Sequence, residues 1–484
     1  MKNSPVSPKA RLFTEKDAIA INRERKRLLN LLSGRVCYSF NGNKIHYGAL
    51  SPGCVACAKG TWSCIYIHNK CNTDCFFCPR KKNTTNRNLA KTEGGILFGP
   101  DDYADYIDKF GFKGIGFSGG EPLLLFDKLV RYIENVRRKN GNDVYIWMYS
   151  NGKLADIEKL KKLKEAGLNE IRFNISARNY DLTPVRMAKG IIDKVTVEMP
   201  AIPEDYETVK IVLRKLCKIG VDFLNLHQLE TYTGNYKNFV KRNYALLPVP
   251  HSPVFASEVT ALKLLRHAAD KKIKLPINYC SCAYKYNIQL KGRRKRFSQW
   301  LKGRFYDITD FGYVRSFYIT GSKKELKDIV ALFRKNNYSD DLWLLAKDNK
   351  RLFINHNLLR CVPDNAANLN IMYYYPVVTS RPSRDIISQA VTLNSRKKII
   401  VKRKVALNFI KISPLARKTF VKIFLNKEDF SSSMKYFYRN YIISSANDVK
   451  KMNAENNAFL VLRQFEHTGL GFPAVKPHQF SLYE

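Results

Sequence analysis

The sequence predicts an α/β fold in which the strands of a parallel sheet alternate with helices. The chain has 484 residues, 45% of them hydrophobic, which is enough for a large core and two or three domains. Short apolar, β-branched or aromatic runs alternate with amphipathic segments, the pattern of βα units. The predicted strands are Trp62–His68, Gly114–Phe117, Val144–Tyr149, Glu170–Ile175, Lys194–Met199 and Phe223–Leu229. The predicted helices are Asp102–Phe110, Leu124–Lys139, Leu154–Ala166, Thr183–Ile192 and Glu204–Ile219.

Residues 1–50 are expected to form a lead-in to these units. Within them, Glu15–Leu32 carries an apolar stripe among charged residues, and Gly34 follows as a stop signal, so we predict a helix. We expect this helix to pack on the main domain. The alternative is a basic helix that faces RNA through Arg23, Arg25, Lys26 and Arg27.

The strongest chemical signal is a C-x3-C-x2-C group formed by Cys71, Cys75 and Cys78. Three close thiolates supply three of the four cysteine ligands that a [4Fe–4S] cluster usually has, and they leave one iron open for another ligand. The alternative is a zinc knuckle, but zinc sites usually show paired C-x2-C arms and four nearby ligands. The spacing therefore favours an iron–sulfur cluster with one open iron.

A second signal, Gly119-Gly120-Glu121-Pro122, follows the predicted strand Gly114–Phe117. Glycine lets a backbone approach a ligand closely, and Glu121 offers a carboxylate to an ammonium group. Alone, this segment is an ordinary turn. Ligands of parallel α/β barrels bind at the carboxyl ends of the strands, and both this segment and the cysteine group fall at such ends.

Together the two motifs resemble those of the radical SAM superfamily. The resemblance implies a partial (β/α)6 TIM-like barrel in which Cys71, Cys75 and Cys78 hold a [4Fe–4S] cluster. It also implies that the open iron binds S-adenosylmethionine (SAM), which is cleaved reductively to a 5′-deoxyadenosyl radical. The expected cofactors are therefore this cluster and SAM, and the expected electron donor is a flavodoxin- or ferredoxin-type protein.

The same resemblance implies a set of cofactor-binding residues. Phe77 matches the aromatic residue that the family prefers before the last cysteine, and Gly119–Pro122 corresponds to the segment that binds the amino group of SAM. Asn151 and Ser176, at the ends of the third and fourth strands, are expected to contact the ribose or carboxylate. Pro200–Pro203 is expected at the adenine pocket. The alternative for each is a turn residue or a helix cap.

A second group of cysteines surrounds the predicted barrel. Cys54 and Cys57 form a C-x2-C pair, and Cys280 lies far downstream; we predict that these three form an auxiliary iron–sulfur or zinc site, with Cys64 or Cys282 as a candidate fourth ligand. The alternative is a set of small buried hydrophobic residues. Eight of the eleven cysteines fall in three short groups, which packing alone does not require. We expect the isolated cysteines, Cys37, Cys217 and Cys361, in the core.

The order of these cysteines resembles a poorly characterised radical SAM subgroup related to pyruvate formate-lyase activating enzyme. This resemblance covers roughly residues 50–300 and implies no particular substrate. We predict a barrel core at residues 51–235 and a barrel-closing segment at 236–304 that contains Cys280, Cys282 and a basic stretch. A small α+β unit at 305–380 and a basic, mainly helical extension at 381–484 are expected to follow.

The α+β unit is predicted from a strand at Val314–Ile319, a helix at Lys323–Lys335 and a hairpin of Leu342–Leu345 with Arg351–Ile354. A polar linker is expected at Thr379–Arg384. The extension is predicted to be helical near Leu415–Leu425, Phe430–Tyr441 and Asn447–Phe465.

The net charge of +41, with 83 basic and 42 acidic residues, favours an anionic macromolecular partner such as RNA or an acidic peptide. The alternative is a generally basic composition. Residues 281–484 carry 37 Lys and Arg against 15 Asp and Glu, and residues 1–280 carry 46 against 27, so the excess marks no single domain. Residues 284–300 interleave basic and aromatic side chains, as in single-stranded RNA sites, although a solvated helix packed on the barrel is the commoner outcome. The residues concerned are Tyr284, Lys285, Tyr286, Lys291, Arg293, Arg294, Lys295, Arg296, Phe297 and Trp300.

No stretch of about 18 apolar residues predicts a membrane helix, and Met1–Phe13 lacks the apolar core of a signal peptide, so we expect a cytoplasmic protein whose cysteines bind metals rather than form disulfides. The first hypothesis is a radical SAM enzyme that modifies a peptide or protein. Modification of tRNA or other RNA is the alternative. A non-enzymatic zinc or iron–sulfur protein and an electron carrier are less favoured, because Gly119–Pro122 has no role in them.

Overall fold

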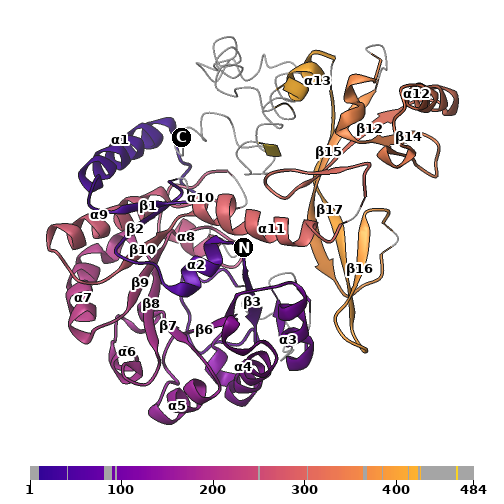
Figure 1. The fold of residues 1–484 in the computed structure, drawn as a ribbon. Helices are drawn as coiled ribbons and strands as arrows, with labels where there is room; N and C mark the ends of the chain where they lie inside the picture. The colour runs from indigo at the N-terminus through magenta and orange to yellow at the C-terminus, as the bar shows by residue number, and fades with distance from the viewer. Residues whose placement is uncertain are drawn as a thin grey trace, which may run out of the picture. The chain divides into compact units, whose positions relative to one another are not determined.

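The protein is described here from a computed structural model (Figure 1). It describes residues 10–40, 42–80, 90–92, 95–96, 98–248, 251–301, 303–363, 368–383, 385–412, 414–422, 426 and 465–466. The chain separates into two compact units. The first contains residues up to Gln289 together with Leu393–Lys397, and the second contains Leu290–Thr392 and residues from Lys398 onward.

The first unit is a ten-stranded sheet ringed by helices, an open α/β barrel (Figure 1). Its strand order is β1-β2-β10-β9-β8-β7-β6-β5-β3-β4, so β1 and β4 are its edges. The seven neighbouring strands β10, β9, β8, β7, β6, β5 and β3 run parallel. The remaining three strands, β1, β2 and β4, pair antiparallel. The strands are β1 (Cys37–Ser39), β2 (Lys44–Tyr47), β3 (Trp62–Tyr66), β4 (Lys91–Thr92), β5 (Gly114–Ser118), β6 (Tyr145–Ser150), β7 (Glu170–Phe173), β8 (Lys194–Pro200), β9 (Phe223–His227) and β10 (Ile277–Cys280).

Each of the six predicted strands and five predicted helices is confirmed, with ends that differ by a few residues. The alternation of apolar strands with amphipathic helices therefore predicted this unit correctly. The helices are α1 (Glu15–Leu32), α2 (Pro52–Ala58), α3 (Pro100–Lys109), α4 (Phe126–Asn140), α5 (Ile157–Glu165), α6 (Thr183–Ala188), α7 (Tyr206–Ile219), α8 (Tyr236–Lys241), α9 (Phe255–Asp270) and α10 (Cys282–Tyr284).

Strand β10 is a seventh parallel strand that the sequence did not reveal. It pairs with β9 over Ile277–Cys280 and brings Cys280 into register with His227. The strand is only four residues long, follows Pro276 and carries the polar Asn278 in its centre. Such a short, half-polar run lacks the apolar signal on which strand prediction depends, so only pairing with β9 and β2 makes it a strand.

Helix α1 forms where it was predicted and packs against α9. Thr14 and Asp17 form a capping box at its start, which satisfies two backbone donors that would otherwise lack partners. Leu28 and Leu32 are buried, and Arg25 Nε lies 3.0 Å from Glu258 Oε1 on α9. The helix is therefore part of the first unit rather than a free basic helix.

The second unit is a mainly antiparallel sheet of order β13-β14-β12-β15-β17-β16, with β11 beside β12. The predicted strand at Val314–Ile319, the helix at Lys323–Lys335 and the hairpin around Asp348 are confirmed. Apolar side chains from the sheet and from α12, including Phe317, Leu326 and Phe333, form its core. Its elements are α11 (Lys291–Ser298), β11 (Asp307–Ile308), β12 (Val314–Thr320), α12 (Lys323–Lys335), β13 (Trp343–Leu345), β14 (Arg351–Ile354), β15 (Leu369–Thr379), β16 (Ser388–Thr392), β17 (Lys398–Lys411) and α13 (Pro414–Phe420).

The predicted helical character of the extension is wrong for residues 388–392 and 398–411, which form β16 and β17. In β17, Ile399 and Val401 are buried and Lys402 is more exposed, so apolar side chains recur every second residue on the face of a sheet. Helix α13 overlaps the helix predicted at Leu415–Leu425. The helices predicted at Phe430–Tyr441 and Asn447–Phe465 lie outside the described residues, apart from Phe465 itself.

Within the described part of the chain, no helix has the length and apolar character needed to cross a membrane.

Candidate active site

A cavity of about 360 Å³ opens at the carboxyl ends of the parallel strands of the first unit. Its volume lies in the range of small-molecule sites. All three cysteines of the C-x3-C-x2-C group line it, as do Phe77, Gly119, Gly120, Glu121 and Asn151. The structure therefore brings most of the predicted cofactor-binding residues together, from segments that are far apart in sequence.

The cysteine group lies on a loop after β3 that is held in place by side chains from elsewhere. Thr73 Oγ1 lies 3.2 Å from Cys71 Sγ. The side-chain amide of Asn235 donates to the carbonyl of Phe77 at 2.9 Å, and that of Asn238, on α8, donates to the carbonyl of Phe76 at 3.0 Å. The loop is therefore positioned by its contacts with the segment after β9, a dependence that the local sequence did not show.

Gly119 and Gly120 are needed because the backbone before the cysteine loop passes directly over them. A Cβ on residue 120 would lie 1.5 Å from the carbonyl oxygen of Lys70, and a Cβ on residue 119, where φ is +129°, would lie 2.4 Å from the carbonyl oxygen of His68. The amide of Gly120 donates to His68 O at 2.8 Å. We expected these glycines to let the backbone approach a ligand. In the structure they let the backbone of His68 and Lys70, which leads into the cysteine loop, lie close to the end of β5.

Glu121 presents a buried carboxylate to the cavity. It accepts hydrogen bonds from Ser150 Oγ at 2.9 Å, from the amide of Asn151 at 2.7 Å and from the amide of Leu123 at 3.2 Å. Burial raises the pKa of Glu121, against the effect of these donors. Among the described residues no Lys, Arg or His forms an ion pair with it. A buried carboxylate with fixed donors but no cation fits an ammonium group of a ligand.

The other predicted cofactor residues have mixed outcomes. Asn151 lines the cavity, but its side chain donates to Asn72 Oδ1 at 2.7 Å and so also fixes the cysteine loop. Ser176 is absent from the lining and donates to Asn174 Oδ1 at 2.7 Å, and it is Asn174 that lines the cavity. Pro122 is buried at the start of the short helix Pro122–Leu125 and also does not reach the cavity.

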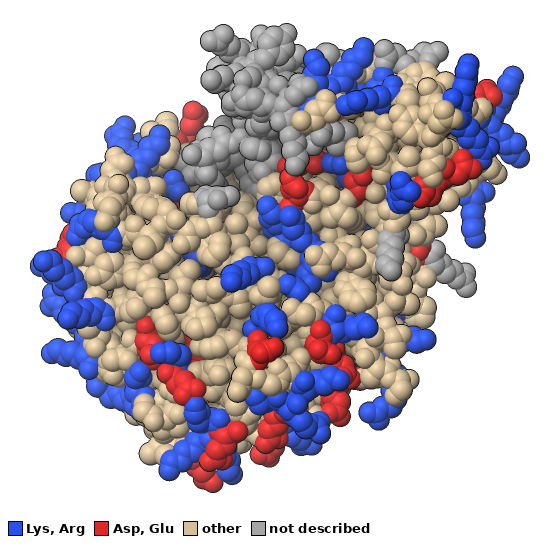
Figure 2. Space-filling model, in the orientation of Figure 1, with Lys and Arg blue, Asp and Glu red and all other residues tan. Residues whose placement is uncertain are grey.

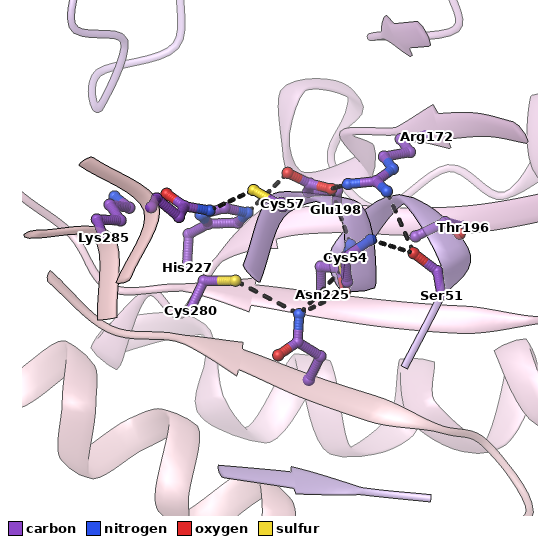
Figure 3. Close-up of polar contacts among 12 residues, drawn as sticks. Ser51, Cys54, Cys57, Arg172, Thr196, Glu198, Asn225, His227, Cys280 and Lys285 are labelled. Carbon is purple, nitrogen blue, oxygen red and sulfur yellow. Dashed lines mark hydrogen bonds and ion pairs between the residues drawn. The ribbon is translucent and has the colours of Figure 1, made fainter. Parts of the chain in front are cut away.

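The cavity has a charged floor whose extent the sequence did not predict (Figure 3). Arg172, on β7, donates to Glu170 at 2.9 Å and to Glu198 Oε2, on β8, at 2.9 Å. His227 Nε2, on β9, lies 2.7 Å from Glu198 Oε1. Although burial raises the pKa of Glu198, the charges of Arg172 and His227 lower it to about 2. A carboxylate within a strand that is otherwise largely buried, as at Glu198, was the signal that could have identified this floor.

A second polar cluster forms the wall near β9. Tyr232 Oη donates to Glu230 Oε2 at 2.8 Å, and Lys285 Nζ lies 3.6 Å from the same oxygen. Tyr286 also donates to Glu230. Lys285 and Tyr286 belong to the stretch in which we considered RNA binding, and here both contact a buried glutamate of the first unit.

The rest of that basic stretch is also partly buried. Arg294, on α11, donates to the carbonyl of Phe311 at 2.8 Å and is 9% exposed, and Phe297 is buried. Tyr284 is fully buried in the first unit. These residues pack inside the protein, which supports the alternative that the stretch packs its aromatic side chains against protein.

The structure also places the second group of cysteines. Cys54 Sγ and Cys280 Sγ each lie 3.4 Å from Asn278 Nδ2, and Cys57 lies one helical turn from Cys54 on α2. The backbone amide of Cys282 donates to a different residue, Gln228, whose Oε1 lies 2.8 Å away. Cys64 is buried on β3. The prediction that the isolated cysteines are core residues is wrong for Cys37, which is exposed. Cys217 and Cys361 are partly exposed, and Cys361 packs against the core of the second unit.

No three His, Cys, Asp or Glu side chains among the described residues are arranged to hold one metal ion. The cysteines of a [4Fe–4S] cluster are arranged differently from the ligands of a single metal ion, because each cysteine binds its own iron.

Comparison with known proteins links this site to one family. The family model of the radical SAM superfamily matches residues 65–233. A protein of Methanocaldococcus jannaschii with the provisional name glycyl-radical enzyme activating enzyme is 26% identical over 302 residues, which cover 60% of this chain and 79% of that protein. A provisionally named GTP 3′,8-cyclase of the same organism is 37% identical over 133 residues, 27% of this chain and 41% of the cyclase.

Among solved structures, Streptococcus suis SuiB bound to its precursor peptide SuiA is similar with a TM-score of 0.37 and 11% identity, over 61% of this chain and 67% of SuiB. The segment that the family model matches contains Cys71, Cys75, Cys78, Glu121 and the charged floor. Cys54, Cys57 and Cys280 lie outside it.

Proposed function

This chain belongs to the radical SAM superfamily and is an enzyme of that class, and on this premise we propose that it modifies a peptide or protein at the cavity beside Cys71, Cys75 and Cys78. The observation that carries the proposal is the charge of the cavity lining. The lining contains as many carboxylates as Lys and Arg side chains. The cations are Arg80, Arg172 and Lys285, and the carboxylates are Glu121, Glu198 and Glu230. A balanced set of donors and acceptors suits the polar main chain of a peptide, whereas a phosphate-rich substrate requires an excess of cations.

The described residues fit the cofactors that the family implies. Cys71, Cys75 and Cys78 would hold the [4Fe–4S] cluster, and the buried Glu121 carboxylate would bind the ammonium group of SAM. When bound, the cluster and SAM together supply a strongly oxidising carbon radical by one-electron reduction. The electron is proposed to come from a flavodoxin- or ferredoxin-type protein.

The remaining residues of the site position and enclose the reactants. Glu121 is held by three donors, so its carboxylate does not reorganise when a cation binds. Arg172 is fixed between Glu170 and Glu198 and is 4% exposed, so it shapes the floor and is not available as a mobile anion receptor. Glu230 and Lys285 on the opposite wall can accept from and donate to a substrate main chain.

The relative from Methanocaldococcus jannaschii supports a protein substrate, since its provisional name describes the activation of another enzyme. It shares 26% identity over most of its length. We propose the same class of substrate for this chain.

A deuterium-transfer experiment tests the proposal. The reconstituted enzyme is incubated with SAM and dithionite in the presence of either uniformly deuterated total protein or uniformly deuterated RNA from the same cells. We expect deuterium in the released 5′-deoxyadenosine with the protein fraction only, and none with the Cys71/Cys75/Cys78→Ala variant. Deuterium transfer from RNA alone would contradict a peptide or protein substrate.

Modification of RNA is the second candidate, and the net charge of +41 favours it. Lys and Arg side chains are spread over the face shown in Figure 2 rather than gathered in one patch. Binding of bulk tRNA should then weaken steeply with salt, by about −0.7 to −0.9 in log K per log salt for each phosphate contact. The informative variant replaces Arg293, Lys295 and Arg296 and leaves the buried Arg294 intact. Absence of tRNA binding at low salt would remove this candidate.

A further inference from the structure

Three thiols from two distant parts of the sequence meet in the interior of the barrel (Figure 3). Cys54 and Cys57 are three residues apart on α2, so their side chains lie on one face of the helix. Cys280 ends β10, and Asn278 Nδ2 lies 3.4 Å from both Cys280 Sγ and Cys54 Sγ. Cys54 is 4% exposed and Cys280 is 5% exposed. Two of the three thiols are therefore enclosed by protein, and Cys57 is partly exposed.

The groups around these sulfurs are mainly hydrogen-bond donors. Lys44 Nζ lies 3.3 Å from Cys280 Sγ, and Gln289 Nε2 lies 2.6 Å from Cys57 Sγ. Asn278 donates to two sulfurs, as described above. One acceptor, Asn225 Oδ1, lies 3.5 Å from Cys54 Sγ. An environment of N–H donors stabilises sulfur atoms that carry negative charge.

Lys44 gives the strongest indication of that charge. Its side chain is 1% exposed, and its ammonium group lies 3.6 Å from the centre of the Tyr284 ring. Among the described residues no carboxylate forms an ion pair with Lys44. An ammonium group buried without a counter-charge is strongly destabilising, and metal-bound thiolates nearby would supply the negative charge that compensates it.

We propose that Cys54, Cys57 and Cys280 bind a second iron–sulfur cluster in the barrel interior. In an iron–sulfur cluster each thiolate binds a different iron, and here α2 supplies two thiols and β10 the third. Lys44, Asn278 and Gln289 then act as positioning residues that offset the negative charge of the thiolate-bound cluster.

The position of this site indicates electron transfer rather than substrate binding. None of the three cysteines lines the cavity. Asn225 connects the two regions, because its Nδ2 donates to Glu198 Oε2 at 2.9 Å while its Oδ1 contacts Cys54. The second cluster would take up one electron from the same external one-electron reductant and hold it next to the charged floor. A substrate in the cavity would have to pass through the charged floor to reach the iron of the second cluster.

Metal analysis of variants tests the site independently of the proposed substrate. The full chain with Cys71, Cys75 and Cys78 replaced by alanine is reconstituted anaerobically with iron and sulfide. We expect about four iron and four sulfide per chain, the stoichiometry of one cube, and their loss when Cys54, Cys57 and Cys280 are also replaced. The matched control replaces Cys37, Cys217 and Cys361 instead and should retain the iron. One zinc per chain, or no metal, would overturn the proposal.

A reciprocal measurement keeps the test valid if the first variant does not fold. Wild-type protein should hold about eight iron per chain and the Cys54/Cys57/Cys280→Ala variant about four. Equal iron in the two proteins would overturn the proposal. Failure of the deuterium experiment above would leave these iron counts unchanged, so the two proposals fail separately.

The charge of Lys44 offers a second readout. Hydrogen bonds to the sulfurs and net charge set the reduction potential of a cluster, and a nearby cation stabilises the reduced form. We expect Lys44→Met to retain the iron of the second site and to shift its midpoint potential to a lower value, followed by its electron paramagnetic resonance signal. The control Lys59→Met changes an exposed lysine next to α2 and should not shift it. An unchanged potential in Lys44→Met would contradict the placement of the cluster beside Lys44.

Discussion

Gly120 lies so close to Lys70 that a Cβ on residue 120 would stand 1.5 Å from the Lys70 carbonyl oxygen. The amide of Glu121 donates to that same oxygen at 2.9 Å. The end of β5 and the chain that leads into the cysteine loop are thus joined backbone to backbone. The Gly-Gly-Glu-Pro segment and the cysteines form one structural unit.

We therefore predict that Gly120→Ala displaces the cysteine loop. The overlap involves backbone on both sides, so it cannot be relieved by a side-chain rotation, and we expect reduced iron incorporation at Cys71, Cys75 and Cys78. Gly99→Ala is the matched control, because a Cβ there meets nothing nearer than 4.0 Å and φ is −74°. Iron content after anaerobic reconstitution is the measurement. Equal iron in the two variants would contradict the structural role of Gly120.

Replacement of Cys71, Cys75 and Cys78 by alanine should abolish reductive cleavage of SAM. These thiols line the cavity, and no other cysteine does so among the residues that the structure describes. Chromatography of 5′-deoxyadenosine after addition of dithionite measures the reaction. Cys37→Ala, at an exposed position, should cleave SAM at the wild-type rate. Cleavage by the triple variant would show that the assignment of the first cluster is wrong.

Glu121→Gln should weaken SAM binding by about ten- to a hundredfold, since hydrogen bonds to charged groups contribute about 1.5–3 kcal/mol. Burial raises the pKa of Glu121, so the carboxylate takes up a proton at a higher pH than an ordinary glutamate. Wild-type affinity should therefore fall as the pH is lowered through that raised pKa, and the affinity of the variant should not.

Calorimetric titration of the reconstituted protein with SAM provides the affinities. Glu134→Gln, at an exposed position on α4, is the control and should bind like wild type. A variant at Glu121 with wild-type affinity and the same pH dependence would show that this carboxylate does not bind the ammonium group.

Glu198→Gln should destabilise the protein by about 3 kcal/mol at neutral pH, the lower end for removal of one partner from a buried ion pair, because Arg172 keeps Glu170. Burial raises the pKa of Glu198, but Arg172 and His227 lower it from 4.5 to about 2. The stabilisation is therefore present above pH 4.5 and is lost as the pH falls toward about 2.

Denaturant unfolding at several pH values measures this contribution. The difference in stability between wild type and Glu198→Gln should shrink between pH 4.5 and 2, while Glu158→Gln, whose side chain is 81% exposed, should match wild type throughout. A difference that stays constant over this range would contradict the ionised Glu198 of the described site.

The sequence determined the parts of this protein that depend on local pattern. Strands rich in apolar and aromatic residues, such as Tyr145–Ser150, and helices with caps, such as Glu15–Leu32, appear where they were predicted. The C-x3-C-x2-C spacing and Gly-Gly-Glu-Pro were sufficient to predict the position of the cavity, because parallel strands gather their carboxyl ends at one edge.

The tertiary structure alone decided which distant residues meet. The charged floor depends on the register that sets Glu198 beside Asn225 in β8 and β9, and β10 becomes a strand only by pairing with β9 and β2. Residues 398–411 form β17 because β15 offers them an edge, and residues 388–392 form β16 by pairing with β17. Register and long-range pairing arise from the burial of whole faces, and a single residue such as Asn278 carries no local sign that two cysteines lie within 3.4 Å of its side-chain amide.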